Sequence, residues 1–151
     1  MMHYIILRTT AQATEDPTKV RSALELFLPP SSGEKDDNGT IHETSATGYH
    51  GNPIIVMEAE VRKKKDTQYI LNHITRNIGA TGKERLISEL PRRMDDDCNL
   101  FLRFDKQQAY QGRLVITGSS DAVHIKMKIE VYPARREAAI EAAREMFEME
   151  D

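Results

Sequence analysis

The stretch VHIKMKIEV, residues 123–131, alternates apolar and polar side chains without interruption. In a β-strand, a period of two places every second side chain on the same face of the sheet. The apolar set is therefore predicted to face a core, and the polar set, which contains Lys126 and Lys128, to face solvent or a partner. A strand with one wet face is typical of an antiparallel sheet.

The segments on either side of this strand complete an α+β pattern. Further strands are predicted at residues 4–10, 41–47, 54–61, 100–105 and 113–117. Helices are predicted to begin near Asp16, Asp66, Thr81 and Pro133, where a capping side chain or a proline precedes apolar residues at helical spacing. The order is β-α-β-β-α-α-β-β-β-α. We expect a single domain over residues 1–151, with a mostly antiparallel sheet and helices packed on one face.

The overall charge limits the kinds of partner. Lys and Arg number 21 against 24 Asp and Glu, which gives a net charge of -3 and a pI near 6.0. Nucleic-acid-binding domains are usually strongly basic, so contact with RNA must come from a local patch. The single cysteine, Cys98, excludes a disulfide framework, and no stretch has the roughly 20 apolar residues of a membrane helix. We therefore expect a soluble cytoplasmic protein without membrane contact.

The sequence lacks the motifs of the common catalytic and metal sites. Its five histidines are too widely spaced for a zinc motif, and the run of three aspartates at residues 95–97 lacks the spacing of a calcium loop. Neither a nucleophile elbow nor a phosphate-binding loop occurs, and Cys98 is typical of a small core residue. The prediction is a protein that is not an enzyme and that has no metal or cofactor.

Two groups of cations favour binding to an anionic partner. The densest positive run is Arg62-Lys63-Lys64-Lys65, which suits phosphate contacts and equally suits solvated charge before a helix. Lys126 and Lys128 share the polar side of their strand with His124 and Tyr132. Cations beside an aromatic ring on an open sheet suit single-stranded or irregular RNA, although an ordinary wet sheet face has the same pattern.

Two polar loops add hydrogen-bonding and stacking groups. The bend at residues 48–53 contains Tyr49, and the connection at residues 105–112 contains Lys106, Gln107 and Tyr110. Glutamine amides bind base edges or backbone but do not titrate, which suits binding better than acid–base chemistry. The glycines and the proline of these loops are explained by turn formation alone.

Several of these motifs together resemble one family. They are His3-Tyr4, Ala13-Thr14-Glu15-Asp16, the segment from Gly48 to Ile54, Phe104-Asp105-Lys106-Gln107 with Ala109-Tyr110 and Gly112, and Tyr132-Pro133-Ala134 with Arg136-Glu137. Over nearly the whole chain, the sequence resembles an archaeal family of small RNA-binding-domain proteins described as predicted exosome subunits. The resemblance implies a fold similar to the ribosomal protein that binds 5S rRNA. It also implies RNA binding and a link to RNA processing or degradation, and it brings no catalytic residues.

Two hypotheses follow for the function. The first is a non-catalytic RNA-binding protein that is an accessory of an RNA-processing complex. Its phosphate contacts would come from Arg62, Lys63, Lys64, Lys65, Lys106, Lys126 and Lys128, and its stacking and hydrogen bonds from Tyr49, Gln107, Tyr110 and Tyr132. The second is a protein-interaction adaptor or a homodimer, in which the open sheet face or an edge strand pairs with another chain.

Overall fold

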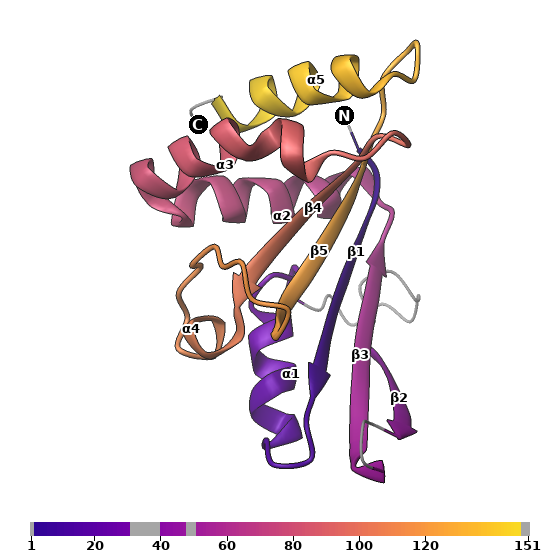
Figure 1. Cartoon of the computed structure of the whole chain (residues 1–151), viewed down its shortest axis with the longest axis vertical. Coiled ribbons are helices and arrows are strands. Elements are labelled where there is room, and N and C mark those ends of the chain that lie inside the picture. Colours follow the sequence, from indigo (N-terminus) through magenta and orange to yellow (C-terminus); the bar gives the residue numbers. More distant parts are fainter. Residues whose placement is uncertain (1, 31–39, 48–50, 149–151) are drawn as a thin grey trace.

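The structure is a computed structural model that describes residues 2–30, 40–47 and 51–148 (Figure 1). Its elements are β1 (Met2–Ala11), α1 (Pro17–Glu25), β2 (His42–Thr47), β3 (Pro53–Val61), α2 (Lys64–Asn77), α3 (Gly79–Arg93), β4 (Asn99–Asp105), α4 (Lys106–Tyr110), β5 (Ala122–Ile129) and α5 (Arg136–Glu148). The five strands form one sheet in the order β2-β3-β1-β5-β4, and every neighbouring pair is antiparallel. The predicted α+β class with an antiparallel sheet is confirmed.

The expected strand at residues 113–117 is reduced to a short run beside β4. A single β-bridge joins Ile116 to Phe104. The backbone N–H of Asp105 donates to the Val115 carbonyl at 2.8 Å, which continues the antiparallel pairing. The preceding polar connection forms the short helix α4, because the Asp105 carboxylate caps it by accepting the Gln108 N–H at 2.8 Å. The chain path is as predicted, with an extra helical turn in the connection.

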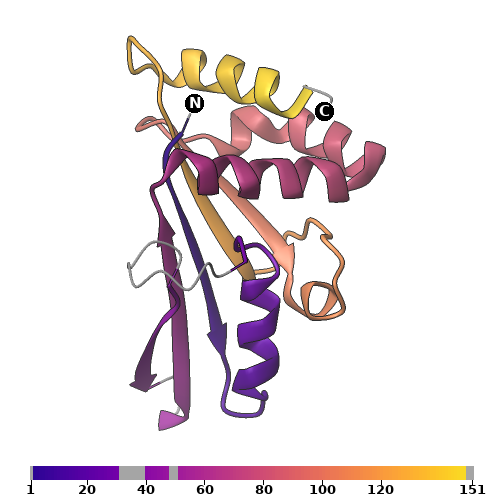
Figure 2. The same ribbon diagram turned by 180° about the vertical axis from the view of Figure 1, so that it is seen from behind.

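One face of the sheet carries the core. Alternate side chains of β1, such as Ile5 and Leu7, are fully buried. The helices cover this face, so that α1 lies behind β1 and β5 in Figure 1 and in front of them in Figure 2. Phe27, just after α1, packs against Phe104 of β4 with ring centroids 5.1 Å apart. Burial of each such large apolar side chain contributes about 1.5–3 kcal/mol, which ties the helices to this face.

The start of α1 follows its local signal, whereas α2 and α3 begin before their expected caps. Asp16 caps α1 by accepting the Thr18 N–H at 2.9 Å, and Pro17 is the first helical residue. Helix α2 begins two residues before the expected cap at Asp66. Helix α3 begins at Gly79, two residues before the expected cap at Thr81, and Gly79 has φ +75, a conformation that favours glycine. No helix in the described ranges is long and apolar enough to cross a membrane.

The antiparallel order decides which loops meet. The end of β3 pairs with the start of β1, and the start of β1 pairs with the end of β5. Residues 62–65, which follow β3, and residues 130–135, which follow β5, therefore lie at one end of the sheet, at the top of Figure 1. Helix α4 and the end of β1 lie toward the opposite end.

Candidate nucleic-acid interface

The sheet face opposite the helices carries cross-strand rows of polar and aromatic side chains. One row runs Arg103–His124–Arg8–Glu58 across β4, β5, β1 and β3. The two arginines of this row lie on β4 and β1 with His124 between them on β5, and the acid lies on β3. Directly opposed side chains have Cβ atoms about 4.5–5.5 Å apart, so members of a row are neighbours.

The next row places an aromatic ring beside a lysine. Phe101 of β4 is directly opposite Lys126 of β5, which is opposite Ile6 of β1. The Phe101 side chain points away from the core and is 42% exposed. An exposed phenyl ring on a sheet is costly to hydrate, and it provides a flat surface on which a base can stack. Lys126 beside it has no acid directly opposite on either neighbouring strand.

The third row lies nearest the upper end of the sheet. Tyr4 of β1 is opposite Lys128 of β5, and the Arg62 guanidinium lies over the Tyr4 ring at 5.0 Å from its centroid. Arg62 also pairs with Glu60 at 2.8 Å. The Lys128 ammonium donates to the Asp97 carbonyl, so the loop before β4 orients this lysine.

We call Tyr4, Arg8, Phe101, Arg103, Lys126 and Lys128 the basic half of the open face. It covers β4, β5 and β1, whereas Glu58 and Glu60 lie on β3. Like charges that crowd on a sheet face destabilise it unless an anion compensates them. The separation of charge therefore favours an anionic ligand that follows β4 and β5.

The loop that holds Lys128 is organised by Asp95. Its carboxylate accepts the N–H groups of Asp97 and Asn99, both at 2.9 Å, and the Asn99 amide at 3.1 Å. Burial acts to raise the pKa of Asp95, but the bonds from Asn99 and Asp97 and the Lys128 charge outweigh it and lower the pKa below its usual value. The carboxylate is thus the form that the fold requires.

We predict a pH-dependent contribution to stability from Asp95. A folded-state pKa below the unfolded value stabilises the protein above the unfolded pKa of about 3.9, and this stability is lost as the pH falls through the folded pKa. Asp95→Asn should therefore unfold at lower urea concentration than the wild type at about pH 7, and the gap should narrow below about pH 4. Urea titrations at several pH values measure this. A gap that stays constant with pH would refute it.

A group of arginines extends the basic half around the β4 edge. Glu89 of α3 is the shared acceptor: Arg85 Nε lies 2.8 Å from Oε1, Arg93 Nη2 lies 3.5 Å from the same oxygen, and Arg92 bonds Oε2. Three cations on one carboxylate leave an excess of positive charge. The Arg92 side chain is 72% exposed, so that this charge reaches the surface.

The arginine group is electrostatically continuous with the open face. Burial, and then the charges of Arg92, Arg85 and Arg103, lower the pKa of Arg93 from its usual value. Arg93 also donates to the backbone carbonyl of Phe101 at 3.3 Å. Arg93 thus links the arginines of α3 to the basic half at the β4 edge.

Lys106 does not have the role that the sequence suggested. Its side chain is 3% exposed, and its ammonium donates to the Thr10 carbonyl at 2.8 Å, to Glu15 at 2.9 Å and to Asp121 at 2.6 Å. Three protein acceptors saturate the three donors of an ammonium group. The expected phosphate contact at Lys106 is therefore wrong, and this lysine instead joins the loop before α1, α4 and the loop before β5.

The other candidate residues fall into two groups. Lys63 is the N-cap of α2, and Lys64 and Lys65 are its first residues, at the upper end of the sheet. Tyr132 is fully exposed. Tyr132 was expected on the polar side of the strand, but β5 ends at Ile129 and Tyr132 lies in the following loop.

The second group lies toward the opposite end of the sheet. Gln107 and Tyr110 lie on α4 beside α1, where Lys19 sits over the Tyr110 ring at 5.4 Å. They are therefore not brought together with the basic half. Tyr49 lies outside the described residues.

The basic half contains residues that the sequence reasoning did not select. Phe101 and Arg103 alternate with the buried Leu100, Leu102 and Phe104, so the period of two already placed them on the outer face. The signal was present, but the sequence does not show that β4 pairs with β5 and brings Phe101 next to Lys126. No group of three metal-binding side chains occurs among the residues that the structure describes.

Fold and surface together define a class of protein: a small α+β protein with a cationic, aromatic sheet face of the kind that binds nucleic acid. The family model described as RNA binding matches residues 4–129, and the chain belongs to this RNA-binding family. Membership in an RNA-binding family, expected from the sequence, is confirmed. The description names binding and no catalytic activity.

Three archaeal relatives are similar over nearly their whole length. The RNA-binding protein PAB1135 of Pyrococcus abyssi is 34% identical over 149 residues, which is 99% of this chain and 96% of that protein. The uncharacterized protein MJ0213 of Methanocaldococcus jannaschii is 31% identical over 143 residues, 93% of each chain. The solved structure of Mth689, a DUF54 protein from Methanothermobacter thermautotrophicus, is 36% identical with a TM-score of 0.80, and the match covers 98% of this chain and 99% of that one.

Proposed function

We propose that this chain is a cytoplasmic, single-domain, non-catalytic RNA-binding protein whose main contact surface is the basic half of the open sheet face. The observation that carries the proposal is the cross-strand pair of Phe101 and Lys126, an exposed ring beside a cation with no acid opposite. Such a pair supplies a stacking surface for a base and an attraction for the adjoining phosphate. Family membership and the relative PAB1135, which is named as an RNA-binding protein, support the same ligand.

The geometry favours single-stranded or irregular RNA. The cations lie on a shallow sheet face and around its β4 edge. Bases of a regular A-form duplex are stacked inside it, whereas single-stranded loops and ends offer bases that can stack on an exposed ring. We propose that Arg8, Arg103 and Lys126 contact phosphates while Phe101 stacks on a base.

The finer proposal is that the protein is an accessory of an RNA-processing or RNA-degrading complex. The resemblance to small archaeal proteins described as predicted exosome subunits supports it, as does the implied similarity to the ribosomal protein that binds 5S rRNA. A surface that binds RNA without acting on it would suit a subunit that holds RNA for a partner. Affinity capture from an archaeal lysate, with and without ribonuclease, separates partners held by protein contacts from those held through RNA.

A titration across a salt series tests the RNA-binding proposal. A labelled single-stranded oligoribonucleotide and an RNA hairpin would be titrated by fluorescence anisotropy at several KCl concentrations. Each phosphate contact contributes about -0.7 to the slope of log Kobs against log salt, so three to five contacts predict a slope of about -2 to -4 for the single strand. An affinity that ignores salt, or no binding at about 50 mM salt, would reject the proposal.

A second candidate function is a homodimer or adaptor formed through β2. This strand is at the edge of the sheet, and all six of its residues are exposed. An edge strand offers backbone groups to which another strand can add. Light scattering over a concentration series measures the assembly: a constant monomer mass, together with no protein partner in the capture experiment, would exclude it.

A further inference from the structure

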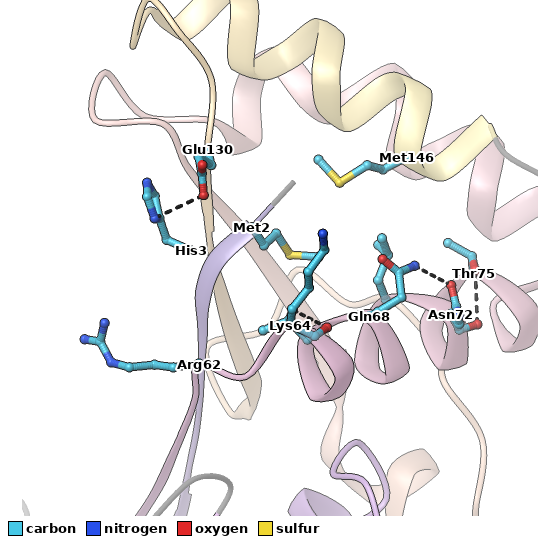
Figure 3. A pocket seen from close by; sticks show the side chains of 11 residues that line it. Met2, His3, Arg62, Lys64, Gln68, Asn72, Thr75, Glu130 and Met146 are labelled. Atoms are coloured by element: carbon cyan, nitrogen blue, oxygen red, sulfur yellow. Dashed lines mark hydrogen bonds and ion pairs between the residues drawn. The ribbon is translucent and has the colours of Figure 1, made fainter.

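A groove between α2 and α5 lies beside the upper end of the sheet, and the RNA contacts proposed above do not use it. Its volume is about 530 Å³, within the range of roughly 300–1,000 Å³ typical of small-molecule sites. We call it the α2–α5 groove, and the residues that matter here are Met2, Lys64, Gln68, Leu71, Asn72 and Met146. Figure 3 shows the side chains of Met2, Lys64, Gln68, Asn72 and Met146 around this space, from β1, α2 and α5.

One part of the groove is apolar. Leu71 is 5% exposed, and Met2 and Met146 are partly buried against the core. Methionine side chains are flexible and polarisable, and they make favourable contacts with the faces and edges of aromatic rings. This part can therefore receive a flat, weakly polar group such as a nucleobase.

The side of the groove formed by α2 carries a pair of amides. Gln68 and Asn72 are one turn apart, and Gln68 Nε2 donates to Asn72 Oδ1 at 2.8 Å. Across the described residues neither amide group makes another hydrogen bond, so Gln68 Oε1 and Asn72 Nδ2 remain as a neighbouring acceptor and donor. Each nucleobase presents donors and acceptors along one edge, and side-chain amides bind such edges.

Cations lie where the groove opens toward the basic half. Lys64 rises from the first turn of α2 into the space between Met2 and Gln68 (Figure 3). Arg62 lines the same groove and also lies over Tyr4 on the open face. Figure 3 shows the Arg62 guanidinium turned away from Lys64, so a phosphate attached to a base in the groove would lie near Lys64. A chain leaving the groove past Arg62 would reach the sheet.

We propose that the α2–α5 groove binds one nucleotide, with its base between Leu71, Met2 and Met146, the edge of the base on the Gln68–Asn72 pair, and its phosphate near Lys64. The inference rests on the proposed function, because it supplies the RNA on the sheet face with a site for one unstacked nucleotide. The same chemistry fits a free nucleotide, so the test distinguishes the two sources.

The first arm uses nucleoside monophosphates and NMR. Titration of the wild-type protein with AMP, CMP, UMP or GMP is expected to shift backbone resonances of residues 64–75 and 146, whereas ribose 5-phosphate, which lacks the base, leaves the groove resonances unshifted. Asn72→Leu should abolish the shifts because it removes the donor while keeping the side-chain volume. Asn77→Leu is the same change on the same helix but outside the groove, and it should keep them.

The second arm measures RNA affinity for the same variants. If the nucleotide belongs to an RNA chain, Asn72→Leu lowers the affinity for a single-stranded oligoribonucleotide by about fivefold or more. The salt slope should stay unchanged, because no phosphate contact is lost. Met146→Trp fills the groove from α5 and should weaken binding in the same way, which guards against a folding defect of one variant.

The outcomes separate this inference from the proposed function. Nucleotide shifts with unchanged RNA affinity of Asn72→Leu would assign the groove to a free nucleotide. Nucleotide shifts in a protein that binds no RNA would support the groove and reject the sheet-face proposal. If no monophosphate shifts the groove resonances, or if ribose 5-phosphate shifts them equally, the groove proposal is wrong even when RNA binds to the sheet.

Discussion

Replacing Lys106 with methionine should lower the free energy of unfolding by about 2–3 kcal/mol, and the melting temperature by about 4–12 °C. The ammonium group is buried and joins Glu15, Asp121 and the Thr10 carbonyl. Without it, the Glu15 carboxylate, whose side chain is 19% exposed, loses its cation. Removing one partner of a fully buried ion pair costs roughly 3–5 kcal/mol. The expected loss at Lys106 is smaller because the Asp121 side chain is 62% exposed and returns to water.

Thermal and urea unfolding measure this effect, and Lys19→Met is the matched control. Lys19 lines the same small cavity of about 230 Å³ but is exposed, so its loss should cost less than about 1 kcal/mol. The loss of stability in Asp121→Asn should lie between the losses in Lys106→Met and Lys19→Met. Equal stability of Lys106→Met and Lys19→Met would contradict the structural role. The salt slope of RNA binding should be the same in Lys106→Met as in the wild type, because this lysine reaches no phosphate.

The double variant Phe101→Ala/Lys126→Glu should lower the affinity for single-stranded RNA by about 100-fold or more at low salt. Loss of one base–aromatic stack costs about 1–3 kcal/mol, and the charge reversal replaces an attraction to phosphate by a repulsion. The salt slope should become shallower by about one contact. Both side chains point away from the core, so the melting temperature should change little.

The chain offers a closely matched control in Tyr110→Ala/Lys19→Glu. Tyr110 is 44% exposed against 42% for Phe101, and it too lies beside a lysine. This pair of residues lies on α4 and α1, away from the basic half. We therefore expect the RNA affinity of the control variant to differ from that of the wild type by less than about threefold. Anisotropy titrations of both double variants compare the two surfaces directly. If the control variant lost more affinity than the Phe101 variant, the RNA site would lie at α4.

The sheet was predictable from the sequence because its signal is local. Residues 123–131 alternate so regularly that one face had to be buried, and the same period at residues 100–105 marked a second strand. The strand at residues 113–117 was less predictable. A single bridge to Phe104 and two backbone hydrogen bonds to Arg103 and Asp105 decide the conformation there, and these contacts join residues about 10–14 positions apart, which local propensity does not record.

The candidate site was predictable only in part. Lys126 and Lys128 were selected correctly as outward-facing residues, because strand alternation alone determines that property. Whether a lysine is free or occupied depends on its neighbours in space. Lys106 looked like another surface cation, yet Glu15 and Asp121, which are 91 and 15 residues away in the chain, bind its ammonium group.

By itself, the sequence determined the α+β class, the antiparallel sheet and the existence of one polar sheet face, because periodicity and capping act over a few residues. Only the tertiary structure decided that β4 lies beside β5, which places Phe101 next to Lys126 and brings the arginines of α3 to the same edge. Strand pairing joins residues distant in the chain and is stabilised by the burial of the opposite face. The function proposed here rests on that pairing.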